Sequence, residues 1–319
     1  MRSLLGALVS AAVIGGSAIA RGKVSHDAGQ AGAGVLMGSQ NIAQRGLMSD
    51  IRLNEQSADH AALKFLDQSD ISATGMLEMF ENLRRLESGV TQKDQFLTDH
   101  PLTTERISTM RNHIAESSIP ADQVPDGFNA MHGRMIAKLV AFLEPYDTTL
   151  KLYPPSDTSV PGRYARAIAE FRRSHLQEAL AGMNGLIKQY PGDAFFYDTK
   201  GQILFENGKV AEAAAAYARA STLMPKSPLI TTEYAKTLIA QNNPALLPQA
   251  IALLERSKEL DDSYDTTWRQ LALAYGQQGR LGLSYEALAE EAALHGDYRT
   301  VIPHVARARQ DAKNDEALR

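Results

Sequence analysis

The chain is 319 residues long, with 44% hydrophobic and 22% charged residues, which is ordinary for a folded protein with room for two hydrophobic cores. Its formal net charge of −4 lacks the excess of positive charge that accompanies nucleic-acid binding, so we expect no nucleic-acid partner. The absence of cysteine excludes disulfides, thiolate metal sites and cysteine nucleophiles, and it does not select a compartment.

Residues 1–23 are an apolar segment rich in Gly and Ala, in which the uncharged run SLLGALVSAAVIGGSAIA separates Arg2 from Arg21. A positive start, an apolar middle and the small residues Ala18 and Ala20 fit a secretory signal peptide. A membrane span is disfavoured because the run is short and made largely of small residues. A third interpretation is an internal segment packed within a larger domain.

Helical periodicity begins after the Gly-rich residues 24–46 and runs from Leu47 to about Ser69. Within this helix Glu55 and Asp59 stand four residues apart, so both carboxylates lie on one face, one turn apart. Such a pair is most often a solvated helix face. In some zinc hydrolases it supplies a metal ligand and the carboxylate that orients a ligand histidine.

Two more helices and a loop precede the second half of the chain. The first helix is expected to have its cap at Ser72 or Thr74. The loop SGVTQKDQFLTDHPL contains His100 and leads to a helix that opens with TTERI. Two prolines then indicate a linker, and the segment FNAMHGRMIAKLVAFLEPY predicts one more helix.

The second half of the chain repeats with a period near 34 residues. Small residues recur at intervals of 34, 34 and 37 in one expected helix of each unit, and at intervals of 34, 37 and 34 in the other. The positions are Ala167, Gly201, Ala235 and Ala272, and then Ala179, Ala213, Ala250 and Ser284. Small residues at helix crossings with this period are typical of tetratricopeptide repeats, and WRQLALAYGQQGR has their Trp-x-x-Leu-small-x-x-Tyr order. The three extra residues fall in the turn NNPALLP.

Such repeats predict a concave surface that holds a peptide or a partner protein. Gln202, Asn207 and Lys236 are candidates to face it. The tail from Asp297 to about Lys313 is expected to form a capping helix, and the last six residues are expected to be frayed.

Taken in order, the apolar segment, the motif NEQSADHAALKFL, the motif HPLTTERI and the repeats resemble the bacterial periplasmic zinc metallopeptidases of the HtpX/BepA type. The resemblance covers essentially the whole chain. It implies an all-α fold, the C-terminal part of a gluzincin-type metallopeptidase domain followed by a tetratricopeptide-repeat α-solenoid. The implied parts are the apolar segment 1–23, a partial metallopeptidase domain over 24–120, a helical linker over 121–159, and about four repeats with a capping helix over 160–319.

The resemblance also assigns roles to four residues. Glu55 is the third zinc ligand, and Asp59 hydrogen-bonds a ligand histidine and fixes its tautomer. His100 gates the metal or contacts the substrate, and Arg106 anchors the His-Pro loop or pairs with an acid. Zinc is the implied cofactor, and a peptide or protein is the implied substrate.

In this family a His-Glu-x-x-His helix supplies the other two zinc ligands and the general base, and the present sequence does not contain that motif. None of the eight histidines begins it: His26, His60, His100, His113, His132, His175, His295 and His304. His26 and His60 are the candidates for surrogate ligands, but neither has a second histidine one helical turn away. A hydrolytic zinc needs three protein ligands and a carboxylate that activates water, so we expect the 319-residue chain to be inactive alone. We therefore interpret residues 1–23 as an internal segment, and the chain as a C-terminal piece of a longer protease.

Two functions follow. The first is a zinc-dependent metalloendopeptidase of the bacterial cell envelope, located in the periplasm, which acts in proteolysis, protein quality control or outer-membrane assembly and binds an envelope protein through the repeats. The alternative is a non-catalytic tetratricopeptide scaffold or chaperone, in which Glu55 and Asp59 have no metal role. Peripheral association with a membrane stays open in both.

Overall fold

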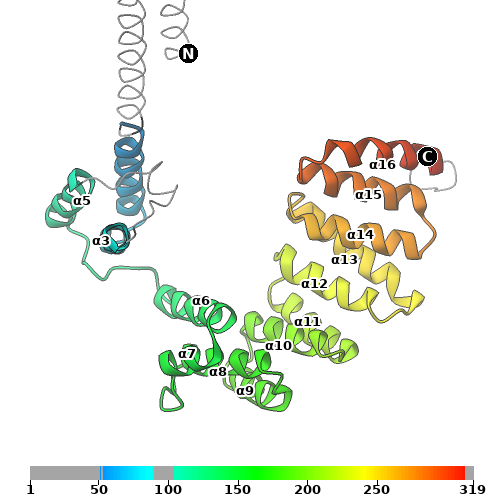
Figure 1. Cartoon of the computed structure of the whole chain (residues 1–319), viewed down its shortest axis with the longest axis horizontal. Helices are drawn as coiled ribbons and strands as arrows, with labels where there is room; N and C mark the ends of the chain where they lie inside the picture. Colours follow the sequence, from blue (N-terminus) through cyan, green and yellow to red (C-terminus); the bar gives the residue numbers. More distant parts are fainter. Residues whose placement is uncertain (1–50, 52, 90–103, 313–319) are drawn as a thin grey trace, which may run out of the picture. The chain divides into compact units, whose positions relative to one another are not determined.

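The computed structural model describes residues 51, 53–89 and 104–312, and over these residues the protein is helical without any β-strand (Figure 1). This confirms the all-α fold class. The chain divides into two compact units between Phe128 and Asn129. Among the described residues, no helix combines the length and the apolar character that crossing a membrane requires.

The first unit contains a helix over residues 53–68, helix α3 (Thr74–Gly89) and helix α5 (Thr104–Glu116). These helices share a small core, which consists of Leu63, Ala73, Phe80, Ile107 and Met110. The Ser72 hydroxyl accepts a hydrogen bond from the backbone N–H of Thr74 at 3.2 Å, and this caps α3 as expected. The His100 loop lies outside the described residues.

The second unit begins with two helices that pack onto the first repeat, α6 (Phe128–Leu143) and α7 (Tyr146–Leu152). Pro145 separates them, because it starts α7 and cannot continue α6. Ala137 and Ala141 of α6 are buried together with Tyr164 and Ile168 of the next helix. The segment 121–159 therefore contributes side chains to the core of the second unit.

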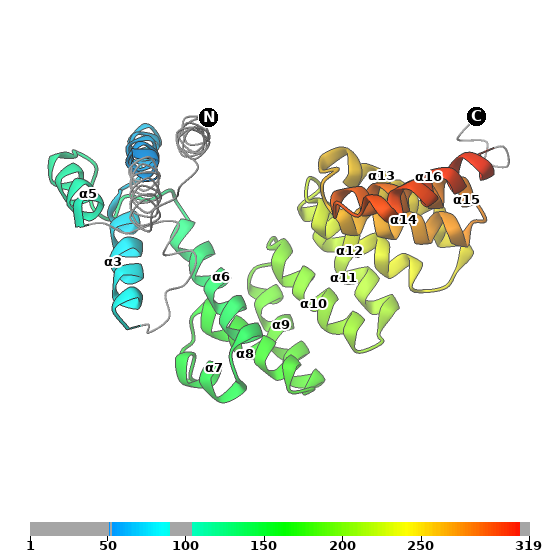
Figure 2. The same ribbon diagram turned by 45° about the horizontal axis from the view of Figure 1, so that its top comes forward.

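Four helix pairs and a last single helix follow in chain order (Figures 1 and 2). The pairs are α8 (Val160–Arg172) with α9 (Leu176–Gln189), α10 (Ala194–Glu206) with α11 (Val210–Leu223), α12 (Pro228–Ile239) with α13 (Leu247–Leu260), and α14 (Asp265–Gln277) with α15 (Leu281–Leu294). The single helix is α16 (Tyr298–Asp311), at the position expected for the cap.

The first helices of the pairs begin at residues 160, 194, 228 and 265, which reproduces the intervals of 34, 34 and 37. The three extra residues form a 3₁₀ turn, Pro244–Leu246, between α12 and α13. The Asn243 side chain caps this turn by accepting a hydrogen bond from the backbone N–H of Ala245 at 3.1 Å. The predicted place of the insertion is therefore confirmed.

Small residues lie where the paired helices cross. Ala235 and Ala250 are fully buried between α12 and α13. Gly201 of α10 faces the ring of Tyr217 of α11, and a Cβ atom added there would lie 2.7 Å from the nearest ring carbon. The two helices approach closely because this position has no side chain, and that is the packing the repeat pattern predicts.

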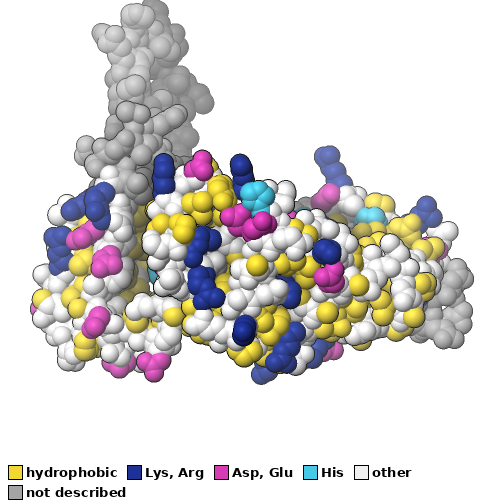
Figure 3. All heavy atoms as spheres, turned by 90° about the horizontal axis from the view of Figure 1, so that it is seen from below, with side chains coloured by type: hydrophobic (Ala, Val, Ile, Leu, Met, Phe, Trp, Pro, Cys, Tyr) yellow, Lys and Arg dark blue, Asp and Glu magenta, His cyan; other side chains and the backbone are white. Residues whose placement is uncertain are grey.

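Acidic, basic and hydrophobic side chains are interspersed on the face drawn in Figure 3. On this face such mixing produces no strong single-sign field, so electrostatic recognition there depends on local arrangements of charge.

We predict that Gly201→Ala destabilises the second unit. Overpacking against the buried Tyr217 ring costs about 1–3 kcal/mol, and the better helix propensity of Ala offsets about 1 kcal/mol of it. Urea unfolding followed by far-UV circular dichroism measures the change. Gly192→Ala is the matched control, because no atom lies within 4 Å of its added Cβ, and it should change stability by less than about 0.5 kcal/mol. Equal midpoints for the two variants would contradict the packing argument.

Candidate functional site

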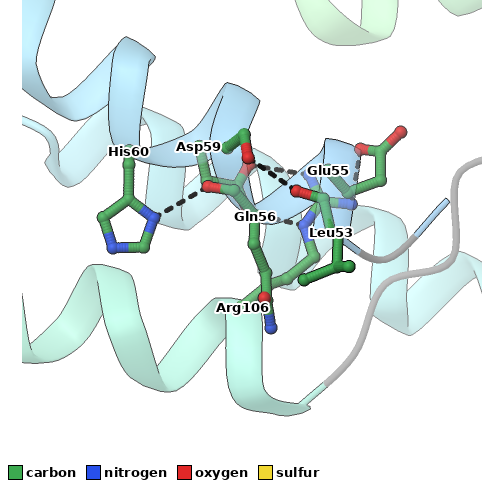
Figure 4. A network of polar contacts seen from close by, with 7 residues as sticks. Leu53, Glu55, Gln56, Asp59, His60 and Arg106 are labelled. Atoms are coloured by element: carbon green, nitrogen blue, oxygen red, sulfur yellow. Dashed lines mark hydrogen bonds and ion pairs between the residues drawn. The ribbon is translucent and has the colours of Figure 1, made fainter. Parts of the chain in front are cut away.

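The candidate site lies on the helix over residues 53–68, where Glu55 and Asp59 are one turn apart on the same face (Figure 4). Both carboxylates point toward Arg106, which belongs to the first turn of α5. Residues at i and i+4 of an α-helix lie on the same face, so the helix itself brings the two acids to one side. The tertiary packing of α5 on this helix brings the arginine to them.

One guanidinium group joins the two acids. Nε of Arg106 lies 2.6 Å from Oδ2 of Asp59, and Nη2 lies 2.8 Å from Oδ1, which is a bidentate pair. Nη1 of the same arginine lies 2.9 Å from Oε2 of Glu55. Bidentate arginine–carboxylate pairs fix both distance and orientation, so Asp59 has a defined rotamer and Glu55 is held beside it.

The network is largely removed from solvent. Asp59 is 3% exposed and Arg106 is 7% exposed. The guanidinium carbon of Arg106 also lies 4.8 Å from the centre of the Phe80 ring, in a cation–π contact. The hydrogen bond to Asp59 is the main cause that raises the pKa of Arg106, and it outweighs the opposing effect of burial. Arg106 is therefore a fixed positive charge next to two acids.

The nearest described histidine does not point its ring into this network. Nδ1 of His60 lies 2.8 Å from the backbone carbonyl oxygen of Gln56 on its own helix, and the side chain is exposed. His113 pairs with Asp67 at 3.0 Å elsewhere in the unit. Within residues 51, 53–89 and 104–312, no group of three or more His, Asp or Glu side chains could hold a metal ion. The described residues alone do not fit a zinc site.

The structure thus brings together three of the four residues that the sequence singled out, Glu55, Asp59 and Arg106. His100 and His26 lie outside the described residues. Both oxygens of Asp59 accept hydrogen bonds from Arg106, a pairing across 47 positions that sequence spacing does not reveal. The contact of the Phe80 ring with the guanidinium likewise depends on the tertiary packing.

We predict that Arg106→Met destabilises the first unit by about 3–5 kcal/mol, because it leaves the Asp59 carboxylate buried without its partner. Hydrogen exchange of the amides in residues 53–68 and in α5 measures the loss, with α12 as an internal reference. Replacing both partners, Asp59→Leu with Arg106→Met, should restore much of the protection.

Arg111→Met is the matched control for this prediction. Arg111 is 54% exposed and pairs with Glu81 at the surface, so its loss should cost less than about 1 kcal/mol. Similar protection in the Arg106 and Arg111 variants would mean that the buried network does not stabilise the unit.

Comparison with known proteins links the first unit to a peptidase family. Residues 1–114 match the model of peptidase family M48. The chain is 25% identical over 312 residues to the beta-barrel assembly-enhancing protease of Yersinia pestis, and the match covers 91% of this chain and 62% of that protein. For the protein of the same name from Escherichia coli K12, the identity is 23% over 288 residues, with 89% and 58% of the two chains covered.

A solved structure called MamA RS-1 ArsTM double mutant is similar to 54% of this chain at 16% identity and a TM-score of 0.43, and the match covers 97% of that structure. The assignment of the fold rests on the helix pairs described above. The chain spans about 60% of the length of the curated relatives it matches. Its N-terminal part thus matches peptidase family M48, and about nine-tenths of its length is similar to beta-barrel assembly-enhancing proteases.

Proposed function

We propose that this chain is part of a zinc-dependent metalloendopeptidase of the bacterial cell envelope, and that it acts in the periplasm on protein substrates in quality control or outer-membrane assembly. The observation that carries the proposal is the ordered pair of Glu55 and Asp59 within the segment that matches the M48 family. In this proposal Glu55 is a zinc ligand, and Arg106 holds its helix against α5. The repeats bind the substrate or an envelope partner.

We further propose that the 319-residue chain does not hydrolyse peptides alone. A hydrolytic zinc requires three protein ligands and a carboxylate to activate water, and the sequence contains no His-Glu-x-x-His. In the proposed parent enzyme, such a helix supplies the two missing ligands and the base. Asp59 then hydrogen-bonds one of these ligand histidines and fixes its tautomer, and His100 contacts the substrate or gates the metal.

The alternative function is a non-catalytic scaffold or chaperone built on the repeats. It is favoured by the finding that Arg106 already pairs with both candidate carboxylates, because a buried ion-pair network of this kind also occurs with a purely structural role. The two functions differ in what Glu55 does, and that difference can be measured.

The first test places a His-Glu-x-x-His segment in front of this chain. The corresponding N-terminal segment of the Yersinia pestis relative is fused to residues 1–319, and cleavage of unfolded casein is measured with zinc and with a chelator. We expect zinc-dependent cleavage by the fusion and none by the 319-residue chain. Sequencing the genomic DNA upstream of the Met1 codon for an in-frame His-Glu-x-x-His tests the same point independently.

Glu55→Gln in the fusion should lower cleavage and zinc content together, by about 100-fold or more in rate, because it removes a ligand and keeps the shape of the side chain. Glu105→Gln is the matched control, since Glu105 is an exposed acid in the first turn of α5. Full activity and zinc content in the Glu55 variant would refute the proposed ligand role of Glu55, whereas a fusion that neither cleaves casein nor holds zinc would favour the scaffold function. Zinc-dependent cleavage by the unfused chain would refute the proposed inactivity.

A further inference from the structure

A pocket of about 330 Å³ lies among the helices of the repeat array, entirely within the second unit. Its lining comes from α6, α10, α11 and α12 and from the residue before α14. Gln202 and Lys236, which the sequence marked as candidates for the concave surface, both line it. Asn207 instead donates its side-chain N–H to the backbone carbonyl of Ile203 at 2.8 Å.

The charges in this pocket do not balance. Three carboxylates line it, from Asp198, Glu206 and Glu233, against two ammonium groups, from Lys138 and Lys236. Lys236 is already neutralised on its own helix, where its Nζ lies 2.9 Å from Oε2 of Glu233. Glu206 accepts a hydrogen bond only from the neutral Gln202 amide, at 2.9 Å, among the contacts of the described residues. The pocket therefore retains a negative charge.

Asp198 is the deepest of the three acids, with only 7% of the residue exposed. Among the described residues its only charged partner is Lys138, at a long 3.5 Å between Nζ and Oδ2. Burial raises the pKa of Asp198 above its usual value, and the long contact with Lys138 only partly opposes this. A buried carboxylate with one distant partner is poorly stabilised, so an added cation would improve its environment.

Aromatic rings supply the rest of the wall. Phe205, Tyr217 and Tyr264 line the pocket, and Lys236 already lies 5.0 Å from the centre of the Phe205 ring. Burial, followed by the nearby carboxylates of Glu233, Asp198 and Glu206, raises the pKa of Tyr217. Rings next to acids favour a guest with an apolar stem and a positive end, because the stem packs on the rings and the charge meets the carboxylates.

We propose that this pocket binds the side chain of a lysine or arginine from an extended segment of a partner or substrate protein. The stem of that side chain lies along the aromatic rings, and its charged end pairs with Asp198 and Glu206. The inference rests on the proposed role of the repeats in holding protein, and it is independent of the peptidase activity. This pocket gives the repeat array a preference for segments that contain lysine or arginine, which the net charge of the chain alone does not predict.

The test uses the full chain and five acetylated, amidated pentapeptides of the form Gly-Gly-X-Gly-Gly. X is arginine, lysine, citrulline, norleucine or glutamate, and binding is followed by amide chemical-shift changes in α10 and α12. We expect the arginine and lysine peptides to bind in the millimolar range. Citrulline has nearly the shape of arginine without its charge, so its peptide should bind about 10-fold more weakly.

Asp198→Asn should lower the affinity for the arginine peptide by about 10-fold and leave the affinity for the citrulline peptide unchanged. Glu212→Gln is the matched control, because Glu212 is an exposed acid of α11 outside the pocket, and it should bind like the wild type. Glu206→Gln, at the exposed edge of the pocket, should lower the affinity for the arginine peptide by about 3-fold. It also keeps the test decisive if Asp198→Asn does not fold.

Two results would overturn the inference. One is preference for the glutamate peptide, lost on replacing Lys138 and Lys236 by Met, which would make this an anion pocket. The other is the absence of any difference between the arginine and citrulline peptides. Neither result affects the casein assay of the fusion, which does not depend on Asp198, so failure here and failure of the proposed peptidase function are distinguishable.

Discussion

The close approach of paired helices is the constraint on which the repeat array depends. It requires a position without a bulky side chain at each crossing. At Gly201, for example, a side chain would clash with the Tyr217 ring. Each pair then presents a face on which the next pair stacks. The pocket around Asp198 exists only because this stacking brings α10, α12 and part of α6 together, so the chemistry of recognition is a product of the spacing between helices.

The first unit depends on a different interaction. Arg106 pairs with Asp59 and Glu55 at once, and in doing so it ties the helix over residues 53–68 to α5. Among the described residues, this network lies beside the hydrophobic cluster of Leu63, Ala73, Phe80, Ile107 and Met110, and Phe80 contacts both. Such networks add less stability than the number of their contacts suggests, and their main effect is to fix the geometry of the side chains. A fixed carboxylate is what a metal site would require of Glu55.

The sequence was informative wherever local spacing determines structure. The 34-residue period predicted the four helix pairs, and the turn NNPALLP was correctly expected to absorb the three extra residues. The i, i+4 spacing placed Glu55 and Asp59 on one face. The resemblance implied that Arg106 anchors the His-Pro loop or pairs with an acid, but it did not identify Asp59 as that acid, because the two residues are 47 positions apart and only tertiary packing brings them together. Gln202 and Lys236 were identified as candidates for the concave surface. Asp198 was not, because its burial and its place in the pocket depend on how the helices pack.

The 3₁₀ turn Pro244–Leu246 shows how the array accommodates changes in length. It lies between the two helices of one pair, and Ala235 and Ala250 at their crossing remain fully buried on either side of it. Added residues are thus confined to a connection, and the register of the following pair is unaffected. This turn is a natural point at which evolution, or an experimenter who inserts a label or an epitope, can lengthen the chain without disturbing the modules that follow.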